Sequence, residues 1–174
     1  MDDIVRQAMA KWPHVPDCYG WLALDSRGRW FLRDDATQAR GPFPLSKGSE
    51  LRHDQLRAFI ERNYSADETG RWFFQNGPQR VFVELELTPL VWRIDPDGSV
   101  TAHTGQPAGP VQQCLLDEAG RLLLHCPLGL GLVHSLDMEH AANQVEAGHW
   151  QPEPVDSRSL GQRFGFIASP ASLL

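Results

Sequence analysis

The residues with the most varied chemistry lie between positions 71 and 80, in the segment Arg-Trp-Phe-Phe-Gln-Asn-Gly-Pro-Gln-Arg. Small-molecule pockets combine such groups, because rings bury apolar ligand surface while amides and guanidinium groups orient its polar atoms. The predicted ligand site consists of Trp72, Phe74, Gln75, Asn76 and Arg80, with Trp92 on the following predicted strand. The alternative is a core hairpin whose rings are buried and whose amides shape the Gly-Pro turn.

Side chains that could bind a metal are concentrated in one stretch, as Cys114, His125, Cys126, His134 and His140. Zinc sites usually take their ligands from close pairs such as Cys-x-x-Cys or His-x-x-x-His, and no such pair occurs here. His125 and Cys126 are adjacent, so on a strand they point to opposite faces. Because no phosphate-binding glycine loop is present either, the sequence predicts no metal and no cofactor.

Paired carboxylates offer a route to acid–base catalysis if they line a cleft. Glu84 and Glu86 share one face of a predicted strand, although we favour a solvated strand face as their setting. Sequence spacing does not exclude a site assembled from distant residues, because catalytic triads form in space. Such a site would combine His53, His103 or His134 with a carboxylate.

Four Asp-x-x-Gly segments predict the hairpins that position these candidates. They begin at Asp25, Asp67, Asp95 and Asp117. Asp suits the first position of a turn, and Gly supplies the left-handed residue that closes it. Their spacing is unequal, which argues against a propeller or solenoid, whose repeat length is fixed.

Hydrophobic periodicity predicts the remaining elements. The expected helices cover residues 2–12, 53–63 and 137–147, and a final edge strand covers residues 163–167. The expected buried faces of the first two helices carry Ile4, Val5, Ala8, Met9 and Trp12, and then Leu56, Phe59 and Ile60. Strict alternation over residues 81–87 predicts a strand with one solvated face.

Composition excludes several classes of protein. The 174 residues include 16 Lys and Arg against 22 Asp and Glu, a net charge of −6, which argues against a general nucleic-acid binder. The acidic start lacks the apolar region of a secretory signal. The longest apolar stretch, residues 128–133, is far short of the ~20 residues of a membrane span. Three cysteines without paired spacing predict free thiols in a reducing cytoplasm.

The sequence also resembles an uncharacterised proteobacterial family of unknown function over most of its length. The similarity rests on residues 11–13, 18–22, 63–64 and 70–81. The first half is similar in element order to a second uncharacterised bacterial family, built from two α+β roll-like subdomains. The resemblance implies an α+β fold with two sheets, and it implies no activity, because neither family supplies catalytic residues to carry over.

Together these observations predict an α+β fold of antiparallel, roll-like meander sheets with about three short helices. We expect an N-terminal subdomain over residues 1–104 and a smaller, β-rich C-terminal subdomain with one helix over residues 105–174, joined at the Gly- and Pro-rich loop 105–110.

The function itself is not specified by the sequence. We favour a non-enzymatic bacterial cytoplasmic module that binds a small ligand or regulates a partner. The alternatives are an enzyme assembled from distant His and carboxylate residues, and a homo-oligomer or protein-interaction module. An apolar pocket with few titratable groups would favour ligand binding, whereas a flat apolar patch containing Trp30 or Trp150 would favour a partner protein.

Overall fold

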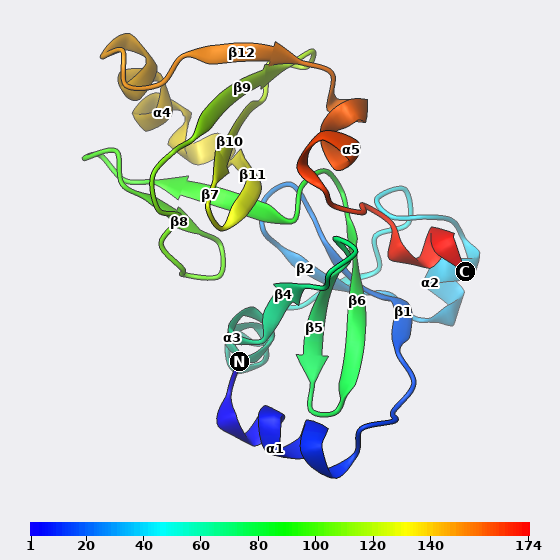
Figure 1. Ribbon diagram of the computed structural model, residues 1–174. Coiled ribbons are helices and arrows are strands. Elements are labelled where there is room, and N and C mark those ends of the chain that lie inside the picture. Colours follow the sequence, from blue (N-terminus) through cyan, green and yellow to red (C-terminus); the bar gives the residue numbers. More distant parts are fainter. The chain divides into compact units, whose positions relative to one another are not determined.

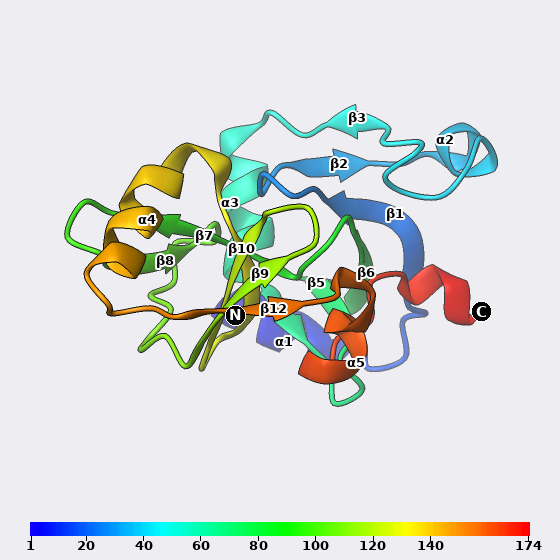
Figure 2. The same cartoon turned by 90° about the horizontal axis from the view of Figure 1, so that it is seen from above.

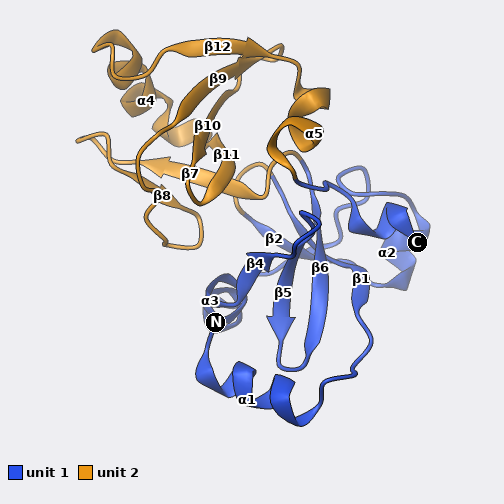
Figure 3. Ribbon diagram, viewed as in Figure 1, with its two compact units in different colours: residues 1–25, 29–86, 166–174 blue, residues 26–28, 87–165 orange.

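Two six-stranded sheets organise the protein, and each forms the centre of its own unit (Figure 3). The computed structural model describes residues 1–174. Unit 1 comprises residues 1–25, 29–86 and 166–174, and unit 2 comprises residues 26–28 and 87–165. Most of unit 2 is therefore inserted into the chain of unit 1 after residue 86.

Unit 1 contains a sheet with strand order β3-β2-β1-β6-β5-β4, in which β1, β2 and β3 run side by side (Figure 2). Its strands are β1 (Cys18–Leu24), β2 (Trp30–Leu32), β3 (Ser49–Glu50), β4 (Tyr64–Ala66), β5 (Trp72–Asn76) and β6 (Gln79–Leu85). Its helices are α1 (Asp3–Lys11), α2 (Asp35–Ala39), α3 (Asp54–Arg62) and the 3-10 helix η3 (Pro170–Leu173).

Unit 2 contains a sheet with strand order β12-β9-β10-β11-β7-β8 (Figure 1). Its strands are β7 (Leu90–Ile94), β8 (Val100–Ala102), β9 (Gln113–Asp117), β10 (Leu122–Cys126), β11 (Gly129–Val133) and β12 (Pro152–Val155). Its helices are α4 (Met138–Glu146), α5 (Leu160–Phe164) and the 3-10 helices η1 (Ser135–Asp137) and η2 (Ser157–Ser159).

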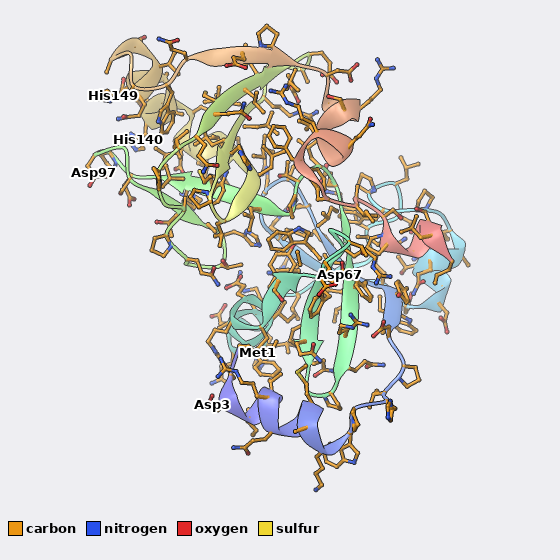
Figure 4. All side chains as sticks on the ribbon, in the orientation of Figure 1. Met1, Asp3, Asp67, Asp97, His140 and His149 are labelled. Atoms are coloured by element: carbon orange, nitrogen blue, oxygen red, sulfur yellow. The ribbon has the colours of Figure 1, made fainter.

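All four Asp-x-x-Gly segments join antiparallel strands, which confirms the predicted hairpins. In three of them the residue after Gly is Arg, and the Asp carboxylate accepts both the backbone N–H and the Nε–H of that Arg. Asp117 accepts these bonds from Arg121 at 2.8 and 2.7 Å, and Asp67, labelled in Figure 4, accepts them from Arg71 at 3.0 and 2.8 Å. The carboxylate thus fixes the turn and also neutralises the cation beside it.

The two units share one arrangement of five strands. The order β2-β1-β6-β5-β4 in unit 1 matches β8-β7-β11-β10-β9 in unit 2, and in each the first hairpin strand runs parallel to the last strand of a three-stranded meander. The register also matches, because Leu22 lies opposite Val83 in unit 1 and Trp92 lies opposite Val133 in unit 2. Residues at equivalent positions in the two arrangements are called counterparts below.

The α+β class is confirmed, and each sheet contains parallel as well as antiparallel pairs. The parallel pair in unit 1 arises because α3 separates the first hairpin from the meander and returns the chain to the other side of the first strand. In unit 2 the loop between β8 and β9 makes the same connection.

The three predicted helices are present as α1, α3 and α4, and two further short helices accompany them. The predicted edge strand over residues 163–167 is wrong. Residues 160–164 form α5, which ends at Gly165 in a left-handed conformation with φ of 68°. Gly is favoured at this position because it lacks the Cβ that strains such a backbone. Of the predicted strand, only Ile167 pairs with another part of the chain, through an isolated parallel β-bridge to Arg71.

Burial differs from expectation on three of the predicted surfaces. In α3 only Ile60 is buried, and Leu56 is 39% exposed. In α1 only Val5 is buried, and Ile4 is 72% exposed. In β6 the face predicted to be solvated is covered, since Phe82 and Glu84 are both buried. The ring of Tyr19 stacks on Phe82 at 4.7 Å between centroids. Residues 166–174 cover Glu84, which accepts hydrogen bonds from Ser169 Oγ and Ala171 N.

The division between the units follows the sheets. β7 and β8 lie before residue 104 in sequence, yet β7 pairs with β11 and belongs to the sheet of unit 2. The chain passes from unit 1 to unit 2 between Glu86 and Leu87, whereas the loop at residues 105–110 lies within unit 2. No helix in the structure combines the length and apolar character that crossing a bilayer requires.

Candidate functional site

A pocket of about 470 Å³ lies on the face of the unit 1 sheet that α3 covers. Leu22 pairs with Leu32 across β1 and β2, and Phe74 pairs with Val81 across β5 and β6, so these four side chains share that face. α3 forms one wall of the pocket, and residues 33–37 around the start of α2 form another. The volume lies in the range of small-molecule sites.

Large apolar side chains that remain exposed surround this pocket. Trp21, Leu32 and Leu56 line it and are 42%, 45% and 39% exposed. Buried apolar residues form the rest of its apolar lining, namely Leu22, Ile60 and Phe74, with the half-buried Val81. Exposed apolar side chains scattered singly are ordinary, but several around one hollow mark a surface that binds another molecule.

The polar lining of the pocket consists of Arg33, Asp34, Thr37, Ser49 and Asn76. Arg33 is only 4% exposed, and its guanidinium donates hydrogen bonds to the carbonyls of Ser46, Gly20 and Gly41 at 3.0, 3.1 and 2.7 Å. These bonds anchor the loop that precedes β3. Burial lowers the pKa of Arg33 from its ordinary value, although the charge of Glu84 opposes this effect.

The start of α2 places a carboxylate on the same side of the pocket as Arg33. Asp34 caps the helix by accepting a 2.8 Å hydrogen bond from the Thr37 backbone N–H. Hydrogen bonding from Thr37 holds the pKa of Asp34 below its ordinary value. The pocket therefore combines a wide apolar surface with the Asp34 carboxylate and the Asn76 amide, an arrangement suited to orienting a mostly apolar ligand, whereas the Arg33 guanidinium is held by three backbone carbonyls.

Two of the six residues of the predicted ligand site line this pocket, Phe74 and Asn76. They are two positions apart on β5, so strand alternation places both on one face. Trp72, two positions earlier, packs its ring against Tyr64 at 4.8 Å between centroids and does not line the pocket.

The other three residues of the predicted set lie elsewhere. Gln75 is buried and donates from its amide to the Gly77 carbonyl, shaping the turn to β6. Arg80 forms a two-pronged ion pair with Asp17, at 3.0 and 2.9 Å. Trp92 belongs to unit 2, where it is fully buried.

The larger part of the pocket lining was not selected in the sequence. Trp21 and Leu22 appeared there only within residues 18–22 of the family resemblance, and Leu56 was expected to be buried beneath its helix. The available signal was the shortness of α3, because a nine-residue helix covers only part of a six-stranded sheet. The exposed side chains lie where that cover is incomplete.

The histidines considered for catalysis have structural partners. Each accepts a hydrogen bond from a backbone N–H at its Nδ1 atom. The donor is Leu56 for His53 at 3.3 Å, Val91 for His103 at 3.2 Å and Leu136 for His134 at 3.1 Å. Burial lowers the pKa of His103 to about 3, so this ring is neutral near pH 7.

The two carboxylates considered for acid–base chemistry have separate partners. Glu84 holds residues 169–171, and Glu86 lies 3.4 Å from Lys47 Nζ. Neither residue lines the pocket.

The cysteines and histidines of unit 2 do not gather into a metal site. The structure contains no group of three His, Cys, Asp or Glu side chains that could hold a metal ion. His140 lies on α4 and His149 just beyond it, at the same end of unit 2 as Asp97 (Figure 4). Burial raises the pKa of Cys114 and of Cys126 to about 11, so both remain protonated thiols near neutral pH.

A second hollow, of about 600 Å³, lies in unit 2 between β9 and β12. Arg158 pairs with Asp156 and Glu118 binds Ser157 at the surface of this hollow, while the buried Asp117 pairs with Arg121. Arg158 is 88% exposed. Exposed ion pairs are weak because water screens them, so they do not fix the positions of side chains that would bind a ligand. The pocket of unit 1 is therefore the stronger candidate site.

Comparison with known proteins places the chain among families without an assigned role. A family model named DUF2944, described as "Protein of unknown function (DUF2946)", matches residues 1–171. The crystal structure of a DUF1285 family protein from Silicibacter pomeroyi DSS-3 is similar, with a TM-score of 0.51 and 14% sequence identity over 82% of this chain and 84% of that chain. At this identity the likeness concerns the fold alone. No curated protein matches the sequence.

Proposed function

The chain belongs to the DUF2944 family of unknown function, and we propose that it binds a small, mostly apolar molecule in the pocket of unit 1. The observation that carries this proposal is the exposure of Trp21, Leu32 and Leu56 around one pocket of about 470 Å³. Burying such side chains against a ligand is favourable by about 25 cal/mol for each Å² of apolar surface removed from water.

The polar groups at one side of the pocket support a ligand with a polar end. Asn76 presents an amide donor and acceptor, while Asp34 presents acceptors. The protein–interaction alternative had pointed to Trp30 and Trp150, but both are buried within their units. The catalytic alternative lacks support in the pocket, whose ionisable side chains are Arg33 and Asp34.

A cytoplasmic location and the absence of nucleic-acid partners remain part of the proposal. Buried thiols such as Cys114 and Cys126 suit a reducing compartment, and the net charge of −6 disfavours a general attraction to phosphate backbones.

The test is binding of the solvatochromic dye 1-anilinonaphthalene-8-sulfonate, followed by fluorescence, with Leu56→Asp as the pocket variant. Leu56 is partly exposed, so the substitution places a charge at the pocket without removing a core contact. We expect the dye affinity to fall at least tenfold. Leu45→Asp is the matched control, because Leu45 is 87% exposed and lies outside the pocket lining.

Equal dye binding by the wild type and both variants would refute the proposal. Sedimentation of the same samples separates the oligomer alternative. A dimer that dissociates on Leu56→Asp would assign the exposed side chains to a subunit interface instead of a ligand.

A further inference from the structure

The counterpart relation between the units shows what the pocket of unit 1 would look like if it were filled. Leu22, at the pocket floor, has Trp92 as its counterpart, because both lie opposite the matching valine of the parallel strand. Phe74 and Val81 pair with each other in unit 1, and their counterparts Leu124 and Gly131 pair with each other in unit 2.

The indole of Trp92 lies on exactly this part of the unit 2 sheet. A Cβ atom at Gly131 would lie 2.4 Å from Nε1 of Trp92, so the ring rests directly on the glycine backbone. Nε1 donates a 2.8 Å hydrogen bond to the carbonyl of Leu124. A planar bicyclic ring therefore covers the counterparts of Val81 and Phe74, two residues of the unit 1 pocket.

The residues beside that ring and their counterparts in unit 1 differ in burial. Trp92 is fully buried, and Ala102, which pairs with it across the hairpin, is 2% exposed. In unit 1 the corresponding pair is Leu22 and Leu32, and Leu32 is 45% exposed. The smaller Leu22 side chain does not extend across the sheet as the indole does, and the exposed Leu32 and the half-buried Val81 border the pocket of unit 1.

We propose that the pocket of unit 1 binds a planar aromatic molecule of about the size of an indole, which covers the sheet as the side chain of Trp92 does in unit 2. The inference rests on the proposed ligand-binding function and specifies the class of ligand. Trp21 and Phe74 provide aromatic surface for stacking, which favours rings over aliphatic chains of equal area. Asn76 would bind a polar substituent at the edge of the ring.

The experiment compares two probes by ligand-observed saturation-transfer NMR, indole-3-acetate as the planar aromatic and decanoate as the aliphatic carboxylate. Both carry one negative charge, so a difference in affinity reports the shape of the apolar part. We expect indole-3-acetate to bind at least tenfold more tightly than decanoate. Decanoate binding as well as or better than indole-3-acetate would overturn the aromatic class while leaving the proposed function intact.

The matched variant introduces into unit 1 the residue pair that fills the equivalent space in unit 2. Leu22→Trp combined with Val81→Gly reproduces the pair that Trp92 and Gly131 form in unit 2. We expect indole-3-acetate affinity to fall at least tenfold in this variant, whereas unchanged affinity would overturn the inference. If the double variant does not fold, Leu32→Trp at the exposed pocket rim replaces it, with Leu45→Trp as control. If neither probe binds the wild type, the proposed function itself fails together with the inference.

Discussion

Replacement of Gly131 by Val tests how closely unit 2 is packed around Trp92. The new Cβ would lie 2.4 Å from Trp92 Nε1 and 2.6 Å from Cε2, far inside van der Waals contact, and the indole has no exposed surface through which to move away. Overpacking of this kind costs about 1–3 kcal/mol. Displacement of the ring also breaks the hydrogen bond to the Leu124 carbonyl, worth about 1 kcal/mol. We expect a loss of about 3 kcal/mol in unfolding free energy.

Trp92→Leu alone should cost about 3 kcal/mol as well, because it leaves a cavity above Gly131. The double variant should lose much less than the sum, since Leu and Val stand together at the counterpart positions, Leu22 and Val81, in unit 1. We expect a coupling energy of about 2–3 kcal/mol, within the range seen for residues in contact. Urea denaturation followed by circular dichroism measures all four proteins. If the loss in the double variant equals the sum of the two single losses within about 0.5 kcal/mol, the idea that Trp92 and Gly131 share one packing volume is refuted.

Three further predictions concern charged and titratable groups. His103 is protonated below pH 6.5 in the unfolded chain, whereas in the folded protein it stays neutral down to about pH 3. The unfolding free energy should therefore fall by about 2 kcal/mol between pH 7 and pH 5. Denaturation midpoints of the wild type and of His103→Gln measure this fall, and an equal fall in both proteins would contradict the prediction. Asp117→Asn should cost about 2 kcal/mol of unfolding free energy, because its buried carboxylate holds the Arg121 guanidinium and two backbone N–H groups. Asp156→Asn, at an exposed pair, should cost much less in the same urea assay. Equal losses would show that burial of the carboxylate does not matter. Glu84→Gln should speed the amide exchange of residues 168–172, because the carboxylate accepts hydrogen bonds from Ser169 and Ala171. Hydrogen–deuterium exchange measures this change. Unchanged protection would show that other contacts fix this segment.

Local chemistry made the hairpins predictable. Asp and Gly at fixed offsets dictate a turn whatever the rest of the chain does, and all four turns formed as expected. The Arg that follows Gly at three of them was present in the sequence, but its ion pair with the turn carboxylate depends on side-chain geometry. The α+β class could also be inferred, because helical and alternating periodicities occur in separate segments.

Long-range pairing limited what could be inferred about the sheets. The parallel contact of β1 with β6 joins segments about sixty residues apart, and periodicity carries no information about such pairing. The same limit applies to β6, because Phe82 is covered by Tyr19 of β1 and Glu84 by residues from the far end of the sequence.

The candidate site shows the same division between local and distant information. Phe74 and Asn76 were selected for their chemistry, and strand alternation places them together. Trp21 and Leu56 come from elements that meet them only in the folded sheet. Trp92 drew attention as an aromatic residue, and its structural role appears only when it is compared with Leu22 of the other unit.

The position of residues 166–174 constrains how the chain can fold during synthesis. These residues belong to unit 1, where Ala168 accepts a hydrogen bond from Leu85 N and Ile167 forms a bridge with Arg71. They leave the ribosome only after all of unit 2 has been made. Nascent unit 1 must therefore wait with the end of β6 around Glu84 and Leu85 uncovered, while unit 2 completes its own sheet. The vectorial order of translation gives unit 2 the first opportunity to reach its native state, and a chaperone that shields the β6 face would protect the nascent chain during that interval.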